Sequence, residues 1–339
     1  MRIGLIDVDG HNFPNIALMK ISAYHKAIND TVEWYNPFEY YDTVYLSKVF
    51  SFSEDYKFPI NARNAVIYGG TGYQINNING IEYFRHSPGI TFLSPYEPKV
   101  LFNNKLPYCI ESQYPDYSIY PDIKDTAFGF LTRGCPRGCK FCHVAAKEGK
   151  HSIKVANLSE FWKGQKNIVL CDPNILACRD WKNLLQQLID SKAWIDFNQG
   201  LDIRLMDEEK AQMITDCKIG QIHFAWDRYE DGKIIIPKLK LFREVYERKK
   251  KWNEHGKIVF VLVNFDTTTQ QDLERIYTLR ELGYWAFVMI YDKENCTDRF
   301  YKDLARWVNN RKIFAVCKTF EEYLKYMRTN KTSNHGKED

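Results

Sequence analysis

Short apolar runs alternate with stretches of helical hydrophobic spacing in the first 70 residues. The run 2–8 predicts a strand, and the apolar residues of 16–27 recur at intervals of three and four, which indicates an amphipathic helix. Three further β-branched or aromatic runs predict strands, at 31–35, 43–47 and 65–68. This order of elements is typical of a small parallel α/β domain of flavodoxin or Rossmann type.

From residue 126 onward, strand patterns alternate regularly with helical ones. Strands are predicted at 128–132, 167–171, 194–197, 221–225, 257–265 and 285–291, and helices at 181–191, 208–217, 237–252 and 270–282. Such alternation requires a parallel sheet with right-handed crossovers. Six strands are too few for a complete (β/α)8 barrel, so the pattern predicts a partial (β/α)6 TIM-like barrel.

Between these two regions, the stretch 76–125 lacks regular periodicity and is punctuated by prolines. We therefore predict five segments along the chain. They are a small α/β domain at 1–110, a connector at 111–125, the partial barrel at 126–292, a C-terminal helical extension at 293–329 and a disordered tail at 330–339.

Composition adds the class of protein and its compartment. Of the 339 residues, 45% are hydrophobic and 15% aromatic, which excludes a globally disordered chain. The nine cysteines are odd in number and mostly scattered, so a disulfide scaffold is excluded and a reducing, cytoplasmic location is expected. The N-terminus is too short and acidic for a signal peptide, and no apolar run approaches the roughly 18 residues of a membrane span.

Charge gives little reason to expect a nucleic-acid partner. The formal net charge is only +4, and the one dense basic run is Arg248-Lys-Lys-Lys251. This run closes the predicted helix 237–252, where cations stabilise the negative end of the helix dipole. A structural role for the run is therefore favoured over an RNA contact.

The densest chemistry of the chain is the stretch Gly-Cys-Pro-Arg-Gly-Cys-Lys-Phe-Cys-His at 134–143. Its cysteines, Cys135, Cys139 and Cys142, are separated by three and then two residues. A closed structural zinc or iron–sulfur site requires four protein ligands, whereas three leave one coordination position open. His143 could complete a zinc site, but adjacent side chains such as those of Cys142 and His143 tend to diverge.

This stretch resembles the signature of radical S-adenosylmethionine (radical SAM) enzymes, Cys-x3-Cys-x-aromatic-Cys, with Phe141 in the aromatic position. The resemblance implies an oxygen-sensitive [4Fe–4S] cluster held by the three cysteines, with SAM on the fourth iron. The reduced cluster would cleave SAM to a 5′-deoxyadenosyl radical, which abstracts a hydrogen atom from a substrate that the sequence does not identify. It also implies a partial (β/α)6 barrel and an electron donor of flavodoxin or ferredoxin type.

Polar residues follow the predicted barrel strands, at the edge where barrel enzymes place their active sites. They are Asp172, Asn174, Asn198, Asp227, Arg228 and Asn264. The resemblance implies that Asp172 or Asn174 binds the methionine amino group, although the family's Gly-Gly-Glu is absent. It also implies that Asp227, Arg228 and Asn264 bind the ribose and the methionine carboxylate. Phe141 would lie near the adenine.

Several of these strand-end residues have a second interpretation. Asp172 and Asp227 could equally cap the helices that follow them. Asn198 opens the run Asn-Gln-Gly-Leu-Asp-Ile-Arg, which is similar to the third strand of a subset of the radical SAM family. In that run, Arg204 could bind a carboxylate or phosphate of the substrate, or form a structural ion pair.

The N-terminal domain resembles a degenerate cobalamin-binding domain, because Gly69-Gly-Thr-Gly72 follows a predicted strand as a cofactor-contacting loop would. The Asp-x-His-x-x-Gly motif for an axial histidine is missing, and Asp9-Gly-His11 is only a fragment of it. Cobalamin is therefore not the favoured cofactor, and a cobalamin-dependent radical SAM methyltransferase is the alternative function.

Two other functions are less favoured. A non-catalytic zinc- or RNA-binding protein would use the cysteine loop as a structural knuckle. A tRNA methylthiolase would need a second three-cysteine cluster near the N-terminus, where only Cys109 lies. Cys171, Cys178 and Cys317 lack recognisable ligand spacing and are expected to be buried structural thiols.

Overall fold

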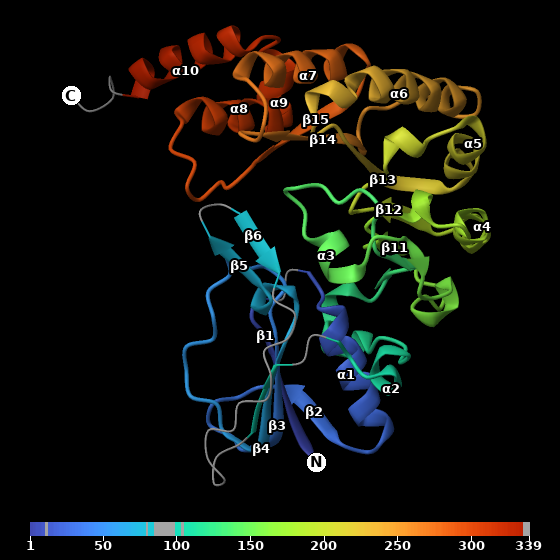
Figure 1. The fold of residues 1–339 in the computed structure, drawn as a ribbon, viewed down its shortest axis with the longest axis vertical. Coiled ribbons are helices and arrows are strands. Elements are labelled where there is room, and N and C mark those ends of the chain that lie inside the picture. The colour runs from blue at the N-terminus through green and yellow to red at the C-terminus, as the bar shows by residue number, and fades with distance from the viewer. Residues whose placement is uncertain (11–12, 79–80, 85–98, 103–104, 335–339) are drawn as a thin grey trace. The chain divides into compact units, whose positions relative to one another are not determined.

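The computed structural model describes the chain except residues 11–12, 79–80, 85–98, 103–104 and 335–339 (Figure 1). Its contacts divide it into two compact units, Met1–Asp196 and Phe197–Asp339. In the part of the chain that is described, no helix is both long enough and apolar enough to cross a lipid bilayer. The predicted segment boundaries are a different division and remain predictions.

The first unit begins with a five-stranded parallel sheet in the order β2-β1-β3-β4-β7. Its strands are β1 (Arg2–Asp7), β2 (Thr31–Trp34), β3 (Tyr41–Ser47), β4 (Ala62–Gly69) and β7 (Lys99–Phe102). The predicted parallel α/β domain is therefore confirmed. This strand order is of the flavodoxin type, in which the chain reverses its direction of travel across the sheet between β1 and β3.

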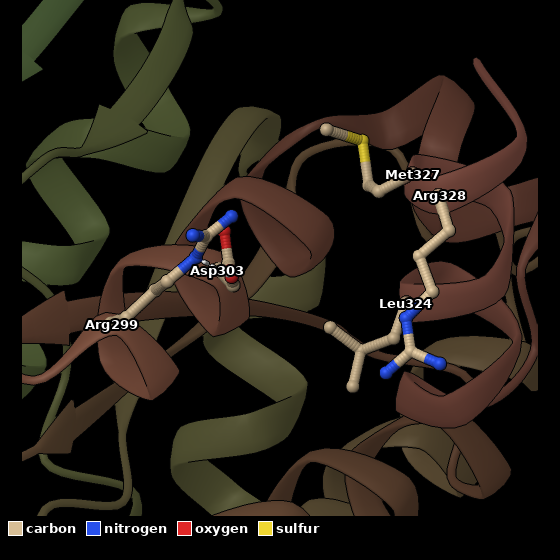
Figure 2. A pocket seen from close by; sticks show the side chains of 5 residues that line it. All are labelled: Arg299, Asp303, Leu324, Met327 and Arg328. Carbon is tan, nitrogen blue, oxygen red and sulfur yellow. Dashed lines mark hydrogen bonds and ion pairs between the residues drawn. The ribbon is translucent and has the colours of Figure 1, made fainter. Parts of the chain in front are cut away.

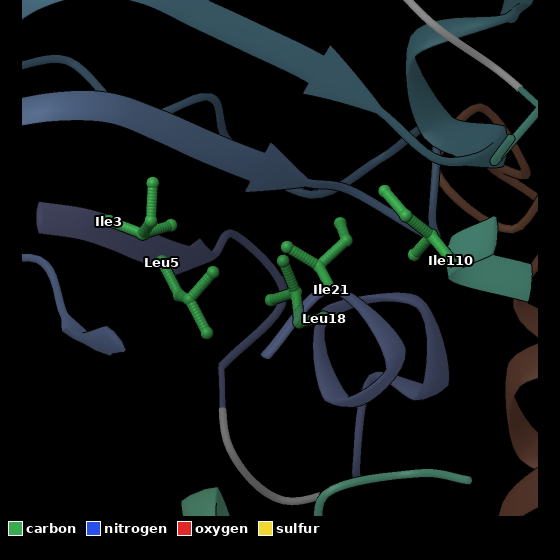
Figure 3. Close-up of a cluster of buried hydrophobic side chains, with 5 residues drawn as sticks. All are labelled: Ile3, Leu5, Leu18, Ile21 and Ile110. Carbon is green, nitrogen blue, oxygen red and sulfur yellow. The ribbon is translucent and has the colours of Figure 1, made fainter. Parts of the chain in front are cut away.

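Helix α1 (Ile16–Ala27) covers one face of this sheet. Asn15 caps the helix by accepting a hydrogen bond from the Leu18 amide, and the buried side chains form a cluster with β1 (Figure 3). The cluster consists of Ile3, Leu5, Leu18, Ile21 and Ile110. Alternate residues of β1 point to opposite faces, so Ile6 packs instead in a second cluster with Tyr41, Val44, Leu46 and Val66.

The stretch that lacks periodicity contains more regular structure than the sequence predicts. β5 (Ile75–Ile78) and β6 (Ile81–Phe84) form an antiparallel pair, and β7 adds a fifth strand beside β4. The connector holds α2 (Tyr108–Glu111) and two single-turn 3-10 helices, at Tyr117–Ile119 and Pro121–Ile123. These strands have four residues each and lie among polar residues and prolines, so no regular alternation marks them in the sequence.

The second sheet has six strands in the order β15-β14-β13-β12-β11-β8. Its first three strands along the chain are β8 (Thr126–Gly129), β11 (Asn167–Leu170) and β12 (Trp194–Phe197), with α4 (Trp181–Ser191) between the last two. Two-residue strands β9 (Thr132–Arg133) and β10 (Ile153–Lys154) pair antiparallel on either side of the cysteine loop. β8 and β11 pair in parallel, as the partial-barrel prediction requires.

The second unit continues the alternation with β13 (Lys218–Ala225), β14 (Lys257–Val263) and β15 (Trp285–Ile290), which pair in parallel. The helices between and before them are α5 (Glu208–Asp216), α6 (Gly232–Glu247) and α7 (Thr269–Glu281). Helix α7 begins with the predicted capping box between Thr268 and Gln271 and packs on β14 and β15. The predicted α/β class, with a small parallel domain before a partial barrel, is therefore confirmed.

Helix α6 corrects one prediction, because it begins at Gly232 rather than at Pro237. Proline favours the first turn of a helix, which made it the expected start, but here it lies inside the helix. Only glycine fits the actual first position, since a Cβ atom on Gly232 would lie 2.4 Å from Cζ2 of Trp226. The helix also ends earlier than the predicted residue 252, at Glu247, so the basic run lies beyond it.

The basic run therefore stabilises a different helix end from the one expected. Lys250 donates to the carbonyl oxygens of Thr215 and Cys217 at the C-terminus of α5, and Lys249 pairs with Asp216 at 2.6 Å. Arg248 pairs with Glu208 at the other end of α5. Cations at a helix C-terminus are stabilised by the dipole, so the structural interpretation of the run is supported.

Three helices follow β15: α8 (Arg299–Asn309), α9 (Arg311–Val316) and α10 (Phe320–Asn334). They surround the fully buried Trp307, whose ring contacts those of Phe314 and Phe320. Helix α10 continues into the segment predicted as a tail, and residues 335–339 lie outside the described residues. A hollow of about 300 Å³ lies between α8 and α10, lined by Arg299, Asp303, Leu324, Met327 and Arg328 (Figure 2). None of the predicted site residues lines it.

Candidate functional site

The cysteine loop begins just beyond the carboxyl end of β8 and is closed at its base by backbone hydrogen bonds. The amide of Cys135 donates to the carbonyl of Gly149 at 3.1 Å, and the amide of Cys142 donates to that of Cys139 at 3.0 Å. Helix α3 (Val144–Glu148) follows the last cysteine directly. The loop thus connects the paired strands β9 and β10 and lies at the carboxyl end of a barrel strand, where a barrel carries its active site.

Glu148, the last residue of α3, joins the two ends of the cysteine loop by hydrogen bonds. One carboxylate oxygen accepts a hydrogen bond from Arg133 at 2.7 Å, and the other accepts one from the Gly134 amide at 3.2 Å. The guanidinium of Arg133 also lies over the ring of Phe130, 3.4 Å from its centroid. A charge-assisted pair of this kind holds the loop at the residue immediately before Cys135.

The thiols of Cys135 and Cys139 are half-buried and that of Cys142 is exposed. Among the described residues, no three histidine, cysteine or carboxylate side chains converge at metal-binding distance, so the three thiols must turn toward one another to hold a metal. Asn174 lies beside the first of them, because its Nδ2 donates to Sγ of Cys135 at 3.5 Å. Ser152 fixes Asn174 by donating to its carbonyl oxygen at 2.7 Å.

Asp172 is buried beneath the start of the loop. Its carboxylate accepts three hydrogen bonds, from the amides of Leu131 and Thr132 and from the Thr132 hydroxyl, at 2.5 to 3.0 Å. Burial nevertheless raises the pKa of Asp172 to about 6, against the lowering effect of these donors. The residue therefore braces the chain between β8 and β9, while Asn174 is the one of the pair beside a cysteine.

Phe141 is half-buried within the cysteine loop. Outside this loop, five cysteines of the described chain are buried. Burial raises the pKa of Cys171 and of Cys217 to about 12, so both remain protonated thiols at neutral pH. Cys178 and Cys317 are also buried, as expected for structural thiols. Cys109 is exposed.

The glycine turn of the N-terminal sheet is explained by packing within the chain. A Cβ atom on Gly70 would lie 2.2 Å from the carbonyl oxygen of Lys48, and one on Gly72 would lie 2.6 Å from that of Phe50. The turn also contacts the helix after the cysteines, because Lys147 of α3 donates to the hydroxyl of Thr71. The glycines thus let two backbone segments meet, and the turn lies next to the cysteine loop.

Polar side chains, most of them buried, are hydrogen-bonded to one another at the carboxyl ends of β1 and β3. Tyr120 of the connector donates to Asp7 at 2.7 Å and accepts from the Asn15 amide at 3.1 Å. Asn15 in turn donates to the Ser47 hydroxyl at 2.8 Å. Nearby, Tyr117 receives a hydrogen bond from the Phe128 amide at 3.0 Å, so the connector contacts both the N-terminal sheet and β8. His11 lies outside the described residues.

In the second unit, the predicted site residues lie just after their strands, as expected. Asn198 follows β12 in a turn closed by a hydrogen bond from the Gly200 amide to the Phe197 carbonyl. Asn264 has a left-handed backbone (φ 62°) and donates to the Tyr291 carbonyl at 3.1 Å, which joins the ends of β14 and β15. Arg228 is exposed, with its nearest carboxylate, that of Glu230, 4.0 Å away.

Asp227 follows β13 and is partly buried. Burial raises the pKa of its carboxyl group to about 6, while the guanidinium groups of Arg275 and Arg204 act in the opposite direction. Arg204 itself pairs with Asp202 at 2.7 Å and Asp231 at 2.8 Å, so it forms the structural ion pair that the sequence left as one of two roles. Arg275 is a residue that the sequence did not single out, because an arginine on an amphipathic helix ordinarily faces water.

Comparison with known proteins adds to this geometry at the level of the fold. No protein-family model and no curated protein matches the chain significantly. Among solved structures, the radical S-adenosylmethionine methyltransferase TsrM from Kitasatospora setae, with cobalamin and a [4Fe–4S] cluster bound, matches at a TM-score of 0.51 and 10% identity. That match covers 85% of this chain and 72% of the other.

The same methyltransferase with tryptophan substrate and a SAM analogue bound matches at a TM-score of 0.55 and 11% identity, covering 86% and 72% of the two chains. Identities this low carry no residue roles from one protein to the other. Over most of its length, the chain shares the fold of a radical SAM methyltransferase.

Proposed function

We propose that this protein is a radical SAM enzyme whose [4Fe–4S] cluster is held by Cys135, Cys139 and Cys142. The observation that carries the proposal is the three-cysteine motif on the loop that follows the first strand of the six-stranded sheet. The motif and the fold are two independent lines of support, because the structural match has only about one identical residue in ten and so does not arise from sequence similarity.

The residues around the loop fit such a cluster. Three thiols are the donor set that binds iron–sulfur clusters while leaving one iron open, and an amide that donates to a ligand sulfur tunes its potential. Asn174 makes such a contact with Cys135. When bound, the cluster would supply the electron that cleaves SAM.

The chain's own residues would have separate tasks in this proposal. Asp172 and Glu148 hold the two ends of the cysteine loop. Asn174, which lies beside Cys135, would offer polar atoms to the methionine amino group, and Asn198, Asp227, Arg228 and Asn264 would offer donors and acceptors at the strand ends for the ribose and the methionine carboxylate. Phe141 would contact the adenine. An electron donor of flavodoxin or ferredoxin type and a reducing, cytoplasmic location belong to the same proposal.

Anaerobic reconstitution with iron and sulfide tests the proposal directly. We expect about four irons and four sulfides per chain and formation of 5′-deoxyadenosine from SAM after reduction. Replacing Cys135, Cys139 and Cys142 together by alanine should abolish the brown chromophore. The matched controls Cys171→Ala, Cys178→Ala and Cys317→Ala should retain it, because these thiols are buried elsewhere.

Two results would contradict this proposal. Stoichiometric zinc without sulfide would establish the structural-knuckle alternative. Loss of chromophore in the control variants would indicate an auxiliary cluster that the proposal does not contain.

A second candidate is a cobalamin-dependent radical SAM methyltransferase. Two observations favour it: the flavodoxin-type strand order of the N-terminal sheet, and a match to a cobalamin-bound methyltransferase too extensive to come from residues 111–339 alone. Against it, the carboxyl ends of β1 and β3 are filled by Tyr120, Asp7 and Asn15. The general radical SAM activity therefore remains the first proposal.

A further inference from the structure

Helix α7 carries an ion pair that is completely removed from water. The guanidinium of Arg275 and the carboxylate of Asp272 lie 2.5 Å apart, and both side chains are 0% exposed. They are three residues apart on one face of the helix, and Thr267 also donates to Asp272 at 2.7 Å. Desolvation of two charges usually offsets their attraction, so such a pair is weak support for stability alone.

The terminal nitrogens of the Arg275 guanidinium also donate to carbonyl groups at the ends of two strands. It donates to the carbonyl oxygens of Trp226 and Asp227, at 2.5 and 3.0 Å, just beyond β13. It also donates to the carbonyl of Leu262 in β14 at 2.7 Å. A planar fork with several donors is suited to fixing such groups at defined positions, and a lysine could not replace it.

The two segments held in this way bear predicted site residues. Asp227 is itself one of the residues whose carbonyl is bound, and Asn264 lies two residues after Leu262. The chain after β14 is unusually shaped, since Asn264 and Asp266 both have left-handed backbones, with φ of 62° and 49°. Such conformations persist only where surrounding contacts enforce them, and Thr267 anchors this turn to Asp272.

We propose that Arg275 and Asp272 form a positioning pair that fixes the ends of β13 and β14, so that Asp227 and Asn264 are presented together to the nucleoside part of SAM. The identity of the ligand rests on the proposed function. Neither residue of the pair touches the ligand. Arg275 acts through the loop that it binds, and Asp272 acts by orienting Arg275.

A second effect of Arg275 is electrostatic. Its positive charge favours the ionised form of Asp227, whose pKa burial raises to about 6. The other charged groups that act on this carboxylate are Arg204, which also favours ionisation, and Asp231, which opposes it. Removal of the Arg275 charge should therefore move the ionisation of Asp227 to higher pH.

The same helix provides a matched control. Arg280 also donates to three backbone carbonyls, those of Phe314, Cys317 and Lys318, and it also lies over aromatic rings. These carbonyls belong to the C-terminal helical extension and not to a strand end. An Arg280→Lys variant therefore loses a comparable fork of hydrogen bonds without disturbing the predicted site.

The experiment compares reconstituted wild type, Arg275→Lys, Arg275→Met, Thr267→Val and Arg280→Lys. SAM binding is titrated through the change it causes in the electron paramagnetic resonance spectrum of the reduced cluster, and iron content is measured on every sample. We expect Arg275→Lys to bind SAM about 10-fold more weakly or worse, as displaced supporting contacts generally cause. Thr267→Val, which removes one hydroxyl, should be intermediate, and Arg280→Lys should match wild type.

The pH dependence separates positioning from general damage. Wild-type affinity should fall as the pH decreases through about 6, where Asp227 gains a proton. In Arg275→Met, this fall should begin at higher pH, whereas Arg280→Lys should keep the wild-type profile. The milder Thr267→Val variant keeps the test decisive if Arg275→Met does not fold.

Three results would overturn the inference. Wild-type affinity and pH profile in Arg275→Lys and Thr267→Val would show that the pair does not position the site. An equal loss in Arg280→Lys would show that the effect is general destabilisation. Absence of SAM binding in wild type with a complete cluster would contradict the proposed function and the inference together. This failure is distinguished from failure of the inference alone, because it is seen in the wild-type protein and not only in the variants.

Discussion

Asp172 organises the start of the cysteine loop through a single buried carboxylate. Its pKa of about 6 is higher than the ordinary 3.8, so the folded protein binds a proton there more tightly than the unfolded chain does. The stability that this group contributes is therefore complete below pH 3.8 and is lost as the pH rises through about 6. At about 1.4 kcal/mol per pKa unit, the effect is at most about 3 kcal/mol.

This sign gives a prediction for Asp172→Asn in the metal-free protein. The amide does not titrate, so the difference in urea midpoint between wild type and variant should shift in favour of wild type when the pH is lowered from about 7 to 5. Urea unfolding at the two pH values, followed by fluorescence, measures it. A difference that does not change with pH would show that Asp172 has an ordinary pKa.

Sequence alone identified individual residues where their chemistry is local. The cysteine motif, the polar residues after each strand and the buried thiols could all be named from spacing and context. Arg275 could not be named, because its function depends on carbonyl groups nearly 50 positions earlier in the chain, at Trp226 and Asp227. Nor could the sequence distinguish Asp172, which braces the loop, from Asn174, which lies beside Cys135.

At the scale of single elements, helix α3 connects the cysteine loop to its surroundings through its last two residues. Glu148 pairs with Arg133 and the Gly134 amide, and Lys147 binds Thr71 of the glycine turn. A helix of five residues is too short to be stable by itself. Its position must therefore come from these side-chain contacts, and the shape of the loop depends on them.

We predict that Glu148→Ala loosens the loop without unfolding the protein. Loss of the charge-assisted contacts should lower the free energy of unfolding by about 1–3 kcal/mol. Iron should be lost several-fold faster to a chelator under anaerobic conditions. The control Glu160→Ala removes a comparable carboxylate, which accepts from the Asn157 amide in a 3-10 cap away from the loop. If both variants lose iron at the same rate, the fastening role of Glu148 is wrong.

Elements were predictable where one signal dominated. The bounds of α1, α4 and β12 agree with the sequence pattern residue by residue, because their apolar spacing is uninterrupted. Helix α6 was misplaced because Pro237 gives a strong local start signal that the tertiary contact between Gly232 and Trp226 overrides. Strands β5, β6 and β7 are no shorter than β12, but they were missed because they lie in or next to the proline-punctuated stretch that lacks regular periodicity.

At the scale of the whole molecule, the role of the N-terminal sheet separates the two proposed functions. If the protein is a cobalamin-dependent methyltransferase, purified protein supplied with hydroxocobalamin should retain about one cobalamin per chain through gel filtration. Its absorption spectrum should lack the features of a histidine ligand, because the axial-histidine motif is absent. Retention also requires Tyr120 to leave the carboxyl ends of β1 and β3.

The substitution Tyr120→Phe provides the matched variant for this test. It removes the hydrogen bonds with Asp7 and the Asn15 amide while keeping the ring. Tighter cobalamin retention in Tyr120→Phe than in wild type would show that the tyrosine competes with the cofactor. Failure of both proteins to retain cobalamin would leave the general radical SAM activity as the function.

The connector has a further consequence, for how proteins of this kind exchange parts during evolution. Tyr120 completes the buried polar network of the N-terminal sheet, and three residues earlier Tyr117 supports the first strand of the barrel. A genetic crossover with a relative that lacks these tyrosines would remove the hydrogen bonds to Asp7 and to the Phe128 amide. We therefore expect the N-terminal sheet and the first barrel strands to be inherited as one block, and a hybrid made with a relative should keep the connector together with both of them.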